Sequence, residues 1–479
     1  KYKVMSSKSH NQKKNNLGRR KFIKQSAITA SAFTIVPSFV LGGSRHIPPS
    51  DTLYLAGIGA GGKGASDLTE CAKSPNVKVS FLCDVDDRQT VKSKQNFPTA
   101  KYYKDFRKML DAEHKNIDAV TVSTPDHTHA VAALAAIEKG KHVYVQKPLT
   151  WSIHEARVLT EAARKHKVVT QMGNQGGSGN DVRKMKEIYD AGLIGDVHRV
   201  TAWTNRPVWV QGIAAPKAKE RIPKELDWDL WLGPAQPVMY NKMYVPFGWR
   251  GWTAFGTGAV GDMACHIMDP AFRILPIDYP SDVECSFATP WSGFFQEMMI
   301  PEAFPSASMM YFTFPGKNGK PDIKLTWIDG GLKPERPEEL GADEALGGWD
   351  GGIIFEGTKG KLMADCYGQN PRLLPTALMK DLVVPEKEAR VPEGHYLQWV
   401  NACLKGYGNA TVSSPFDYAG PFTEAMLLGV LAMRSYYLKE NDKYPARRKL
   451  LWDAQNMKVT NVEMANTLVK REPRMGWKI

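Results

Sequence analysis

The residues most suited to chemistry in this sequence begin with a glycine run that directly follows an apolar stretch. The stretch 52–58 leads into Gly59, Gly61 and Gly64, which are spaced as G-x-G-x-x-G. In this pattern the first glycine permits a tight turn, the second lets backbone N–H groups approach a pyrophosphate, and the third lets the following helix pack closely. We therefore predict that this loop binds a dinucleotide through Gly59, Ala60, Gly61, Gly62, Lys63 and Gly64.

An acidic residue at a suitable distance indicates which dinucleotide is bound. A second apolar run, Val77 to Cys83, ends in Asp84, which lies 20 residues beyond Gly64. A carboxylate at this point can accept hydrogen bonds from the hydroxyls of an adenosine ribose. We therefore predict NAD as the cofactor in preference to NADP. A glycine-rich turn in an unrelated α/β domain is the alternative interpretation.

Four further motifs follow the glycine run in a fixed order: S-T-P-D-H-T-H at 123–129, V-Q-K-P-L at 145–149, G-N-Q at 173–175 and G-D-M-A-C-H at 261–266. The first two follow predicted strands, at the carboxyl edge where open α/β sheets bind ligands. Together the motifs resemble those of the Gfo/Idh/MocA family, named for glucose–fructose oxidoreductase, inositol dehydrogenase and a rhizopine-catabolism protein. The resemblance extends from about residue 52 to at least residue 270.

This resemblance implies a nicotinamide-dependent enzyme that acts on a sugar, a cyclitol or a related polyol. It places a catalytic triad of Lys147, Asp262 and His266 at the substrate. It also implies cofactor contacts from Thr124, Pro125, His129, Lys147 and Gln175. Substrate contacts are expected from Lys147, Asn174, Trp249, Arg250, Asp262 and His266.

Elementary chemistry leads to a compatible set of roles. Oxidation of a secondary alcohol needs a base for the hydroxyl proton, and histidine has the side chain whose pKa suits this exchange near neutrality. We expect His266 to be the general acid/base and Asp262 to hold a hydroxyl and orient His266. Lys147 would stabilise developing alkoxide charge and shuttle a proton. Without the family pattern, Asp262 and His266 could simply form a hydrogen bond on a helix surface.

One residue departs from the family pattern. The family commonly has Glu before the Lys-Pro pair, whereas this sequence has Gln146. An anion that would favour the ammonium form of Lys147 is then missing. We therefore expect a lysine that loses its proton more readily.

Histidines and tryptophans in this region allow other interpretations. Asp126, His127 and His129 are residue types that bind zinc, but no second ligand cluster accompanies them, and in the family these residues line the cleft. We therefore expect no metal, and His129 near the nicotinamide. Six tryptophans cluster within fifty residues just ahead of Asp262, and we expect most of them to pack in the core and one or two to touch a sugar ring: Trp203, Trp209, Trp228, Trp231, Trp249 and Trp252. The segment 226–234 resembles an insertion found in exported family members.

The N-terminal segment resembles a twin-arginine export signal. Arg19 and Arg20 precede a weakly apolar run at 26–41, which is shorter than the roughly 20 residues that a membrane-spanning helix needs and is interrupted by Pro37. We expect a soluble periplasmic protein without a stable membrane span. No cysteine offers a lipid attachment site there, and the six cysteines form no C-x-x-C pair.

The charge balance argues against a nucleic-acid partner. Nine of the 63 Lys and Arg residues lie within residues 1–24, which contain no acid. Without residues 1–43, 54 basic residues face 50 acidic ones, a net charge of +4 in place of +13. The basic character therefore belongs mostly to the signal, and the rest of the chain offers no support for binding nucleic acid.

The pattern of apolar segments predicts an α/β fold with two folded domains. Strands and helices alternate from Thr52 to about Met172, which predicts a doubly wound parallel Rossmann sheet. After Gly173 the candidate strands cluster, which predicts an α+β domain with a mainly antiparallel open sheet. We divide the chain into an export segment (1–43), an NAD-binding domain (51–172), a substrate-binding domain (173–440) and an irregular tail (441–479). A last helix is expected at 422–439, and the family suggests a homo-oligomer.

Three functions are compatible with these features. A protein exported in the folded state leaves the cell's NAD pool, so we expect a tightly bound cofactor that a second half-reaction must reset. We predict an NAD(P)-dependent oxidoreductase acting on a carbohydrate by hydride transfer at a secondary alcohol. One alternative is an NAD-dependent glycoside hydrolase that works through a transient 3-keto intermediate. The other is a non-catalytic sugar-binding or regulatory protein with the same fold.

Overall fold

The structure is a computed structural model that describes residues 51–479. The predicted export segment, residues 1–43, therefore lies outside the described residues. Within residues 51–479, no helix is both long and apolar enough to cross a membrane.

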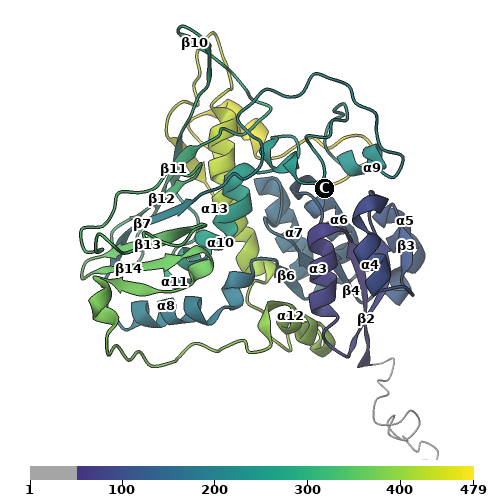
Figure 1. The fold of residues 1–479 in the computed structure, drawn as a ribbon, viewed down its shortest axis with the longest axis horizontal. Helices are drawn as coiled ribbons and strands as arrows, with labels where there is room; N and C mark the ends of the chain where they lie inside the picture. The colour runs from purple at the N-terminus through teal and green to yellow at the C-terminus, as the bar shows by residue number, and fades with distance from the viewer. Residues whose placement is uncertain (1–50) are drawn as a thin grey trace, which may run out of the picture. The chain divides into compact units, whose positions relative to one another are not determined.

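Residues 51–172, called the first half of the protein below, form a parallel sheet of six strands in the order β3-β2-β1-β4-β5-β6 (Figure 1). Residues 173–479 are called the second half. The strands of the parallel sheet are β1 (Leu53–Ile58), β2 (Val77–Cys83), β3 (Lys101–Tyr103), β4 (Ala119–Val122), β5 (His142–Val145) and β6 (Thr170–Met172). The central strands are almost entirely apolar because helices cover both faces of the sheet. The strand order reverses between β1 and β4, and such a switch point leaves a crevice at the carboxyl ends of these two strands.

The helices of this half connect the parallel strands. They are α3 (Gly62–Cys71), α4 (Val91–Asn96), α5 (Phe106–Glu113), α6 (Asp126–Glu138) and α7 (Ile153–His166). Helix α7 starts with a capping box in which Ser152 and Glu155 satisfy each other's backbone N–H groups. The predicted doubly wound parallel sheet is confirmed.

The second half contains a sheet of nine strands in the order β15-β14-β13-β7-β12-β11-β8-β16-β17. The strands are β7 (Val197–Thr204), β8 (Asp282–Phe287), β11 (Ser308–Phe314), β12 (Ile323–Ile328), β13 (Gly351–Gly357), β14 (Lys361–Asp365), β15 (Arg372–Leu374), β16 (Leu450–Asp453) and β17 (Lys458–Val459). All neighbours are antiparallel except β7 and β12. The predicted, mainly antiparallel sheet is therefore confirmed. A separate two-stranded hairpin joins β9 (Trp291–Gly293) and β10 (Gln296–Glu297).

Helices of the second half pack between the two sheets. The long helix α13 (Phe416–Ser435) contacts both α7 of the first half and strand β8 of the second (Figure 1). It starts six residues before the predicted helix at 422–439 and accommodates Pro421. Helices α8 (Asn180–Asp190), α10 (Cys265–Ile267) and α11 (Asp269–Ile274) complete this layer, and a π-helical turn, η7 (Val260–Ala264), precedes α10.

Two segments differ from the sequence-based expectation. The tail 441–479, expected to be irregular, contributes β16 and β17 to the sheet edge. These strands have only four and two residues, which is too short for a clear alternating pattern. Helix α12 (Gly394–Lys405) was not predicted, and it returns from the second half to pack on α3.

Removing the central side chain of α12 should destabilise the first half of the protein. Trp399 is completely buried against the cluster that contains Leu55 and Leu68. We expect Trp399→Ala to lower the free energy of unfolding by about 3–5 kcal/mol, because it leaves a large cavity. Leu404→Ala on the same helix is the control, since Leu404 is 38% exposed, and should cost much less. Equal losses in denaturant unfolding would contradict the packing described here.

Candidate functional site

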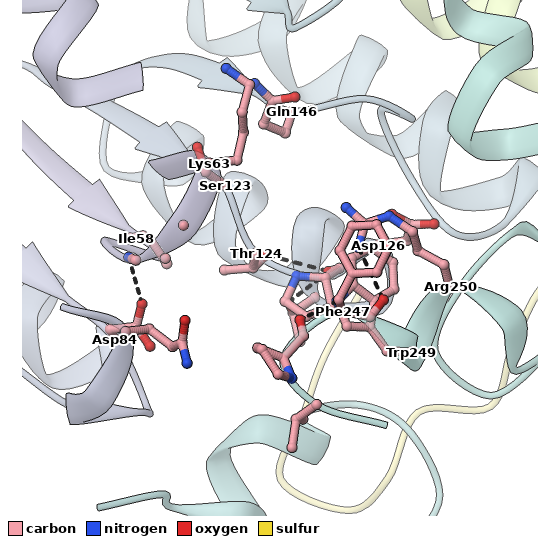
Figure 2. A pocket seen from close by; sticks show the side chains of 18 of the residues that line it. Ile58, Lys63, Asp84, Ser123, Thr124, Asp126, Gln146, Phe247, Trp249 and Arg250 are labelled. Carbon is pink, nitrogen blue, oxygen red and sulfur yellow. Dashed lines mark hydrogen bonds between the residues drawn. The ribbon is translucent and has the colours of Figure 1, made fainter. Parts of the chain in front are cut away.

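A cavity of about 770 Å³ lies at the switch point of the parallel sheet and continues to residues of the second half. Its first end is lined by the glycine loop and Asp84, and its second end by Lys147, Arg250, Asp262 and His266. Figure 2 shows Asp84 beside the glycine loop, and Asp126, Trp249 and Arg250 gathered on the other side of the view. The volume falls within the range usual for small-molecule and cofactor sites.

The backbone of the glycine loop requires its glycines. Gly59 has φ of +78°, and a Cβ there would lie 2.6 Å from the carbonyl oxygen of Ser123. A Cβ on Gly64 would overlap the carbonyl oxygen of Gly59, and one on Gly61 would overlap Gln89. The loop therefore brings bare backbone to the cavity at the start of α3, where a dinucleotide pyrophosphate would fit. Of the six predicted loop residues, Gly59, Gly61, Gly62 and Lys63 line the cavity, while Ala60 and Gly64 lie behind it.

Asp84 is held by backbone at the carboxyl end of β2. Its Oδ2 accepts a hydrogen bond from the Gly61 N–H (2.9 Å), and its Oδ1 accepts one from the Asp86 N–H (3.0 Å). Burial raises the pKa of this carboxyl to about 6, against the effect of the two backbone hydrogen bonds. The carboxylate is therefore in place for an adenosine ribose, and it carries its charge only above about pH 6.

Asp262 joins the two halves of the protein at the second end of the cavity. Lys147 Nζ donates to Asp262 Oδ1 (2.7 Å) and to its carbonyl oxygen (2.8 Å), and Arg250 Nε donates to the same Oδ1 (3.1 Å). Burial alone would raise the pKa of Asp262, but the charges of Lys147 and Arg250 outweigh it and hold the pKa well below the usual range. Asp262 is therefore an ionised hydrogen-bond acceptor.

His266 lines the same end but has a different environment from the one we predicted. Its Nδ1 is enclosed and has no hydrogen-bond partner, and its ring lies 4.6 Å from that of Tyr367. Among the described residues no hydrogen bond joins Asp262 to His266, since both cations contact Oδ1 of Asp262, and the role of Asp262 in orienting His266 stays a prediction. Burial, followed by the charge of Lys147, lowers the pKa of His266 well below its usual value, so the imidazole is neutral.

Gln146 is explained by a buried carboxylate that the sequence analysis did not single out. Asp67 of α3 is fully buried, and its Oδ2 accepts from Gln146 Nε2 (2.9 Å) and Ser123 Oγ (2.7 Å). Its Oδ1 accepts from Tyr396 OH (2.8 Å) and pairs with Lys63. A glutamate at 146 would place a second carboxylate against Asp67. Position 146 therefore supplies no anion to Lys147, whose ion-pair partner is Asp262.

Several predicted residues do not reach the cavity. His129 is 1% exposed, and its ring nitrogens lie 2.7 Å from the Pro148 oxygen and 2.8 Å from the Thr124 oxygen. Asn174 is buried and donates to Asp269 (2.9 Å). These side chains hold the loops behind the wall, and the cofactor contact of His129 and the substrate contact of Asn174 stay predictions. Thr124, Pro125, Gln175, Trp249 and Arg250 do line the cavity.

Three of the six clustered tryptophans line the cavity, and the other three do not. Trp209, Trp231 and Trp249 line the cavity, whereas Trp203, Trp228 and Trp252 do not. The guanidinium of Arg250 lies over Trp249 (4.2 Å) and Phe247 (4.3 Å), which holds its position by cation–π contact. Three residues of the site were not predicted from the sequence: Phe247, Tyr367 and Asp67. Of these three, only Phe247 could have been expected from the sequence, because it lies within the aromatic-rich segment before Asp262.

Two family models match the chain. The model described as "Oxidoreductase family, NAD-binding Rossmann fold" matches residues 55–174, and the one described as "Oxidoreductase family, C-terminal alpha/beta domain" matches residues 178–292. The chain belongs to the Gfo/Idh/MocA oxidoreductase family. It combines the NAD-binding Rossmann fold with the α/β domain of this family.

Curated relatives of this Gfo/Idh/MocA protein match only in part. The chain is 26% identical over 278 residues to a glycosyl hydrolase family 109 protein of Saccharopolyspora erythraea, covering 54% of this chain and 53% of that one. It is 26% identical over 219 residues to an alpha-N-acetylgalactosaminidase of Shewanella oneidensis, covering 40% and 47%. It is 28% identical over 151 residues to the uncharacterized oxidoreductase YrbE of Bacillus subtilis, covering 31% and 43%. The chain thus spans about half the length of these relatives, or less.

Solved structures show the same fold at low identity. Levoglucosan dehydrogenase in complex with NADH has a TM-score of 0.53 and 17% identity, covering 81% of this chain and 98% of that chain. The WlbA dehydrogenase from Bordetella pertussis in complex with NADH and UDP-GlcNAcA has a TM-score of 0.51 and 15% identity, covering 79% and 95%. The two-domain architecture of this Gfo/Idh/MocA protein is therefore that of known dehydrogenases.

The contact between Gln146 and Asp67 predicts that a negative charge at position 146 destabilises the protein. Gln146→Glu should lower the free energy of unfolding by about 1–3 kcal/mol, because one of two facing carboxylates must take a proton or lose a partner. The double variant Asp67→Asn with Gln146→Glu moves the charge and should recover part of this loss. Denaturant unfolding of the parent and both variants provides the measurement. A Gln146→Glu variant as stable as the parent would show that the contact is not made.

The pKa of Asp84 predicts how NAD binding depends on pH. The carboxyl takes up a proton as the pH falls through about 6, and it then loses one acceptor for the ribose hydroxyls. We expect the Kd for NAD, measured on NAD-depleted protein, to rise by up to about tenfold between pH 7 and pH 5. Asp84→Asn is the control and should bind NAD weakly with little change over this range. Parallel pH profiles for the two proteins would exclude Asp84 as the cause.

Proposed function

We propose that this protein is an NAD-dependent oxidoreductase that transfers hydride at a secondary alcohol of a sugar, cyclitol or glycoside. The observation that carries the proposal is the single cavity that joins the glycine loop and Asp84 to Lys147, Asp262 and His266. Asp84 supports NAD in preference to NADP, because a carboxylate binds ribose hydroxyls and repels a 2′-phosphate.

The residues at the second end of the cavity suit an alcohol substrate. When bound, NAD supplies the hydride acceptor. Asp262 Oδ2 accepts no hydrogen bond from any described residue, so it can accept one from a substrate hydroxyl while both cations hold Oδ1. Lys147 beside that hydroxyl stabilises negative charge on its oxygen. His266 presents a neutral imidazole that can take up the hydroxyl proton.

Contacts from distant segments support a tightly held cofactor. Tyr396 of α12 contacts Lys63 (2.7 Å) and accepts a hydrogen bond from Gln175 (2.9 Å), two residues of the cavity wall. Near the C-terminus, Arg474 donates to the carbonyl oxygens of Asp229 (2.8 Å) and Gly233 (3.1 Å), which flank the cavity residue Trp231. A wall closed in this way slows release of the cofactor. Slow release would suit a protein exported in the folded state to the periplasm, as the residues at 18–24 predict.

The matches to glycosyl hydrolase family 109 proteins favour a second candidate. In that reaction the same sugar is oxidised and later reduced again, with cleavage of the glycosidic bond between the two steps. A bound cofactor suits this cycle equally well, since it is reset within each turnover. The proposed hydride transfer is common to both candidates.

Product analysis separates the candidates. The protein with its own bound NAD would be mixed with a panel of sugars, inositol and aryl glycosides, while NADH absorbance and aglycone release are recorded. NADH formation without aglycone release supports the oxidoreductase, and aglycone release without net NADH supports the glycosidase.

Variants test whether the assigned residues do this chemistry. Lys147→Ala and His266→Ala should each lose at least about 100-fold in rate, the usual contribution of a proton-transfer group. The exposed Lys108→Ala is the control and should keep the parent rate. If neither signal appears with any compound, or if Lys147→Ala and His266→Ala react like the parent, the non-catalytic binding protein is the better description.

A further inference from the structure

Asp126 lies in the wall of the cavity at the start of a helix. It is the first residue of α6 and 4% exposed, and the helix dipole favours a negative charge at this position. Among the described residues, the only hydrogen bond to its carboxylate comes from Thr257 Oγ1, which donates to Oδ2 at 2.6 Å from the segment just before η7. Its Oδ1 accepts no hydrogen bond from any described residue, although Asp126 lines the cavity. The helix dipole accounts for a negative charge here, but not for an oxygen without a donor in a side chain of the cavity wall.

We infer that Asp126 is a second acid–base residue of this site, which takes up a proton on the α6 wall of the cavity and returns it. The inference rests on the proposed function, because it requires that a substrate hydroxyl reacts at the second end of the cavity. The substrate O–H bond would break at His266, and the proton would then pass to Asp126 as a carboxyl O–H bond, with bound NAD supplying the hydride acceptor. Thr257 holds the carboxylate by donating to Oδ2, and Oδ1 accepts no hydrogen bond from any described residue.

The neighbouring groups are poorly suited to keep the proton once it has left the hydroxyl. Asp262 stays ionised between Lys147 and Arg250, and His266 is neutral and a weak base because burial opposes its charged form. Burial raises the pKa of Asp126 to about 7, and the nearby charge of Asp262 adds to this rise. The Thr257 hydrogen bond and the charges of Arg250 and Lys147 act in the opposite direction. On its own helix, His127 and His129 are neutral because burial lowers their pKa values.

A carboxyl with this pKa is matched to proton transfer at neutral pH. A group that acts as both acid and base works best when its pKa lies near the working pH. Asp126 has such a pKa and lines the cavity. Its Oδ1 accepts no hydrogen bond from any described residue, and Thr257 donates to its Oδ2. These three features together distinguish it from Asp262, which cannot be protonated at neutral pH.

The first test needs no substrate. Infrared difference spectra between pH 5 and pH 9 would be recorded for the parent, Asp126→Asn and Thr257→Val, each with its native cofactor content. The parent should show a buried carboxylic acid that titrates near pH 7. This signal should be absent from Asp126→Asn, and it should move to higher pH in Thr257→Val, because the donor to the charged form is lost.

The control is a second buried carboxyl outside the cavity. Burial raises the pKa of Asp329 to about 6, and its partners are Ser308 and Trp327. Asp329→Asn should remove a different infrared signal and leave the one near pH 7 in place. An unchanged signal in Asp126→Asn would overturn the inference.

The second test uses any compound that reduces the bound NAD in the parent. Asp126→Asn should slow that reaction by at least about 100-fold and remove the limb of its pH–rate profile near pH 7. Asp329→Asn should keep both the rate and the limb. A parent-like profile in Asp126→Asn would overturn the inference even if the carboxyl titrates as described. If no compound reduces the bound NAD, the proposed function fails, and the infrared titration still decides whether Asp126 exchanges a proton near pH 7.

Discussion

The ion pair between Lys147 and Asp262 is the contact on which the site depends. Lys147 follows β5 of the parallel sheet, whereas Asp262 belongs to the π-helical turn η7 of the second half. Their side chains meet at 2.7 Å and are only 17% and 15% exposed. A partly buried pair is screened much less than a surface pair, and removing one partner leaves a costly unpaired charge. The ion pair therefore adds to the helix contacts between the two halves and lies where cofactor and substrate would meet.

Four carboxylates lie in or behind the cavity wall, and each has different partners. Asp84 faces the ribose end, Asp67 ties together Lys63, Gln146 and Tyr396 behind the wall, and Asp262 stays ionised between two cations. Burial raises the pKa of Asp126 to about 7. The partners of Asp67 also account for Gln146, because a glutamate there would compete with Asp67 for the same donors.

Much of the fold and part of the site could be predicted from sequence. Continuous apolar strands and the glycine spacing identified the parallel sheet and the cofactor loop, because burial and backbone geometry leave few other residues possible there. Helix α12 was not predicted, although His395, Trp399 and Cys403 are spaced four residues apart, as is typical of the buried face of a helix. The strands β16 and β17 are too short for such a pattern.

The side-chain partners within the site could not be predicted. Asp67 follows the glycine motif and Thr257 precedes the G-D-M-A-C-H motif, but neither is part of a motif, and their roles arise from tertiary contacts with Gln146 and Asp126. His129 belongs to a motif that marks the cleft, yet its ring turns inward to two carbonyl oxygens. Motifs therefore located the site, whereas tertiary contacts assign the role of each residue in it.

All the roles proposed above require that the cavity holds NAD tightly and uses it. To test this, the protein would be purified without added nucleotide, dialysed exhaustively and denatured, and the released compounds would be identified and quantified by mass spectrometry. We expect close to one NAD per chain. A protein that releases no dinucleotide would contradict tight binding, and release of NADP in place of NAD would contradict the role assigned to Asp84.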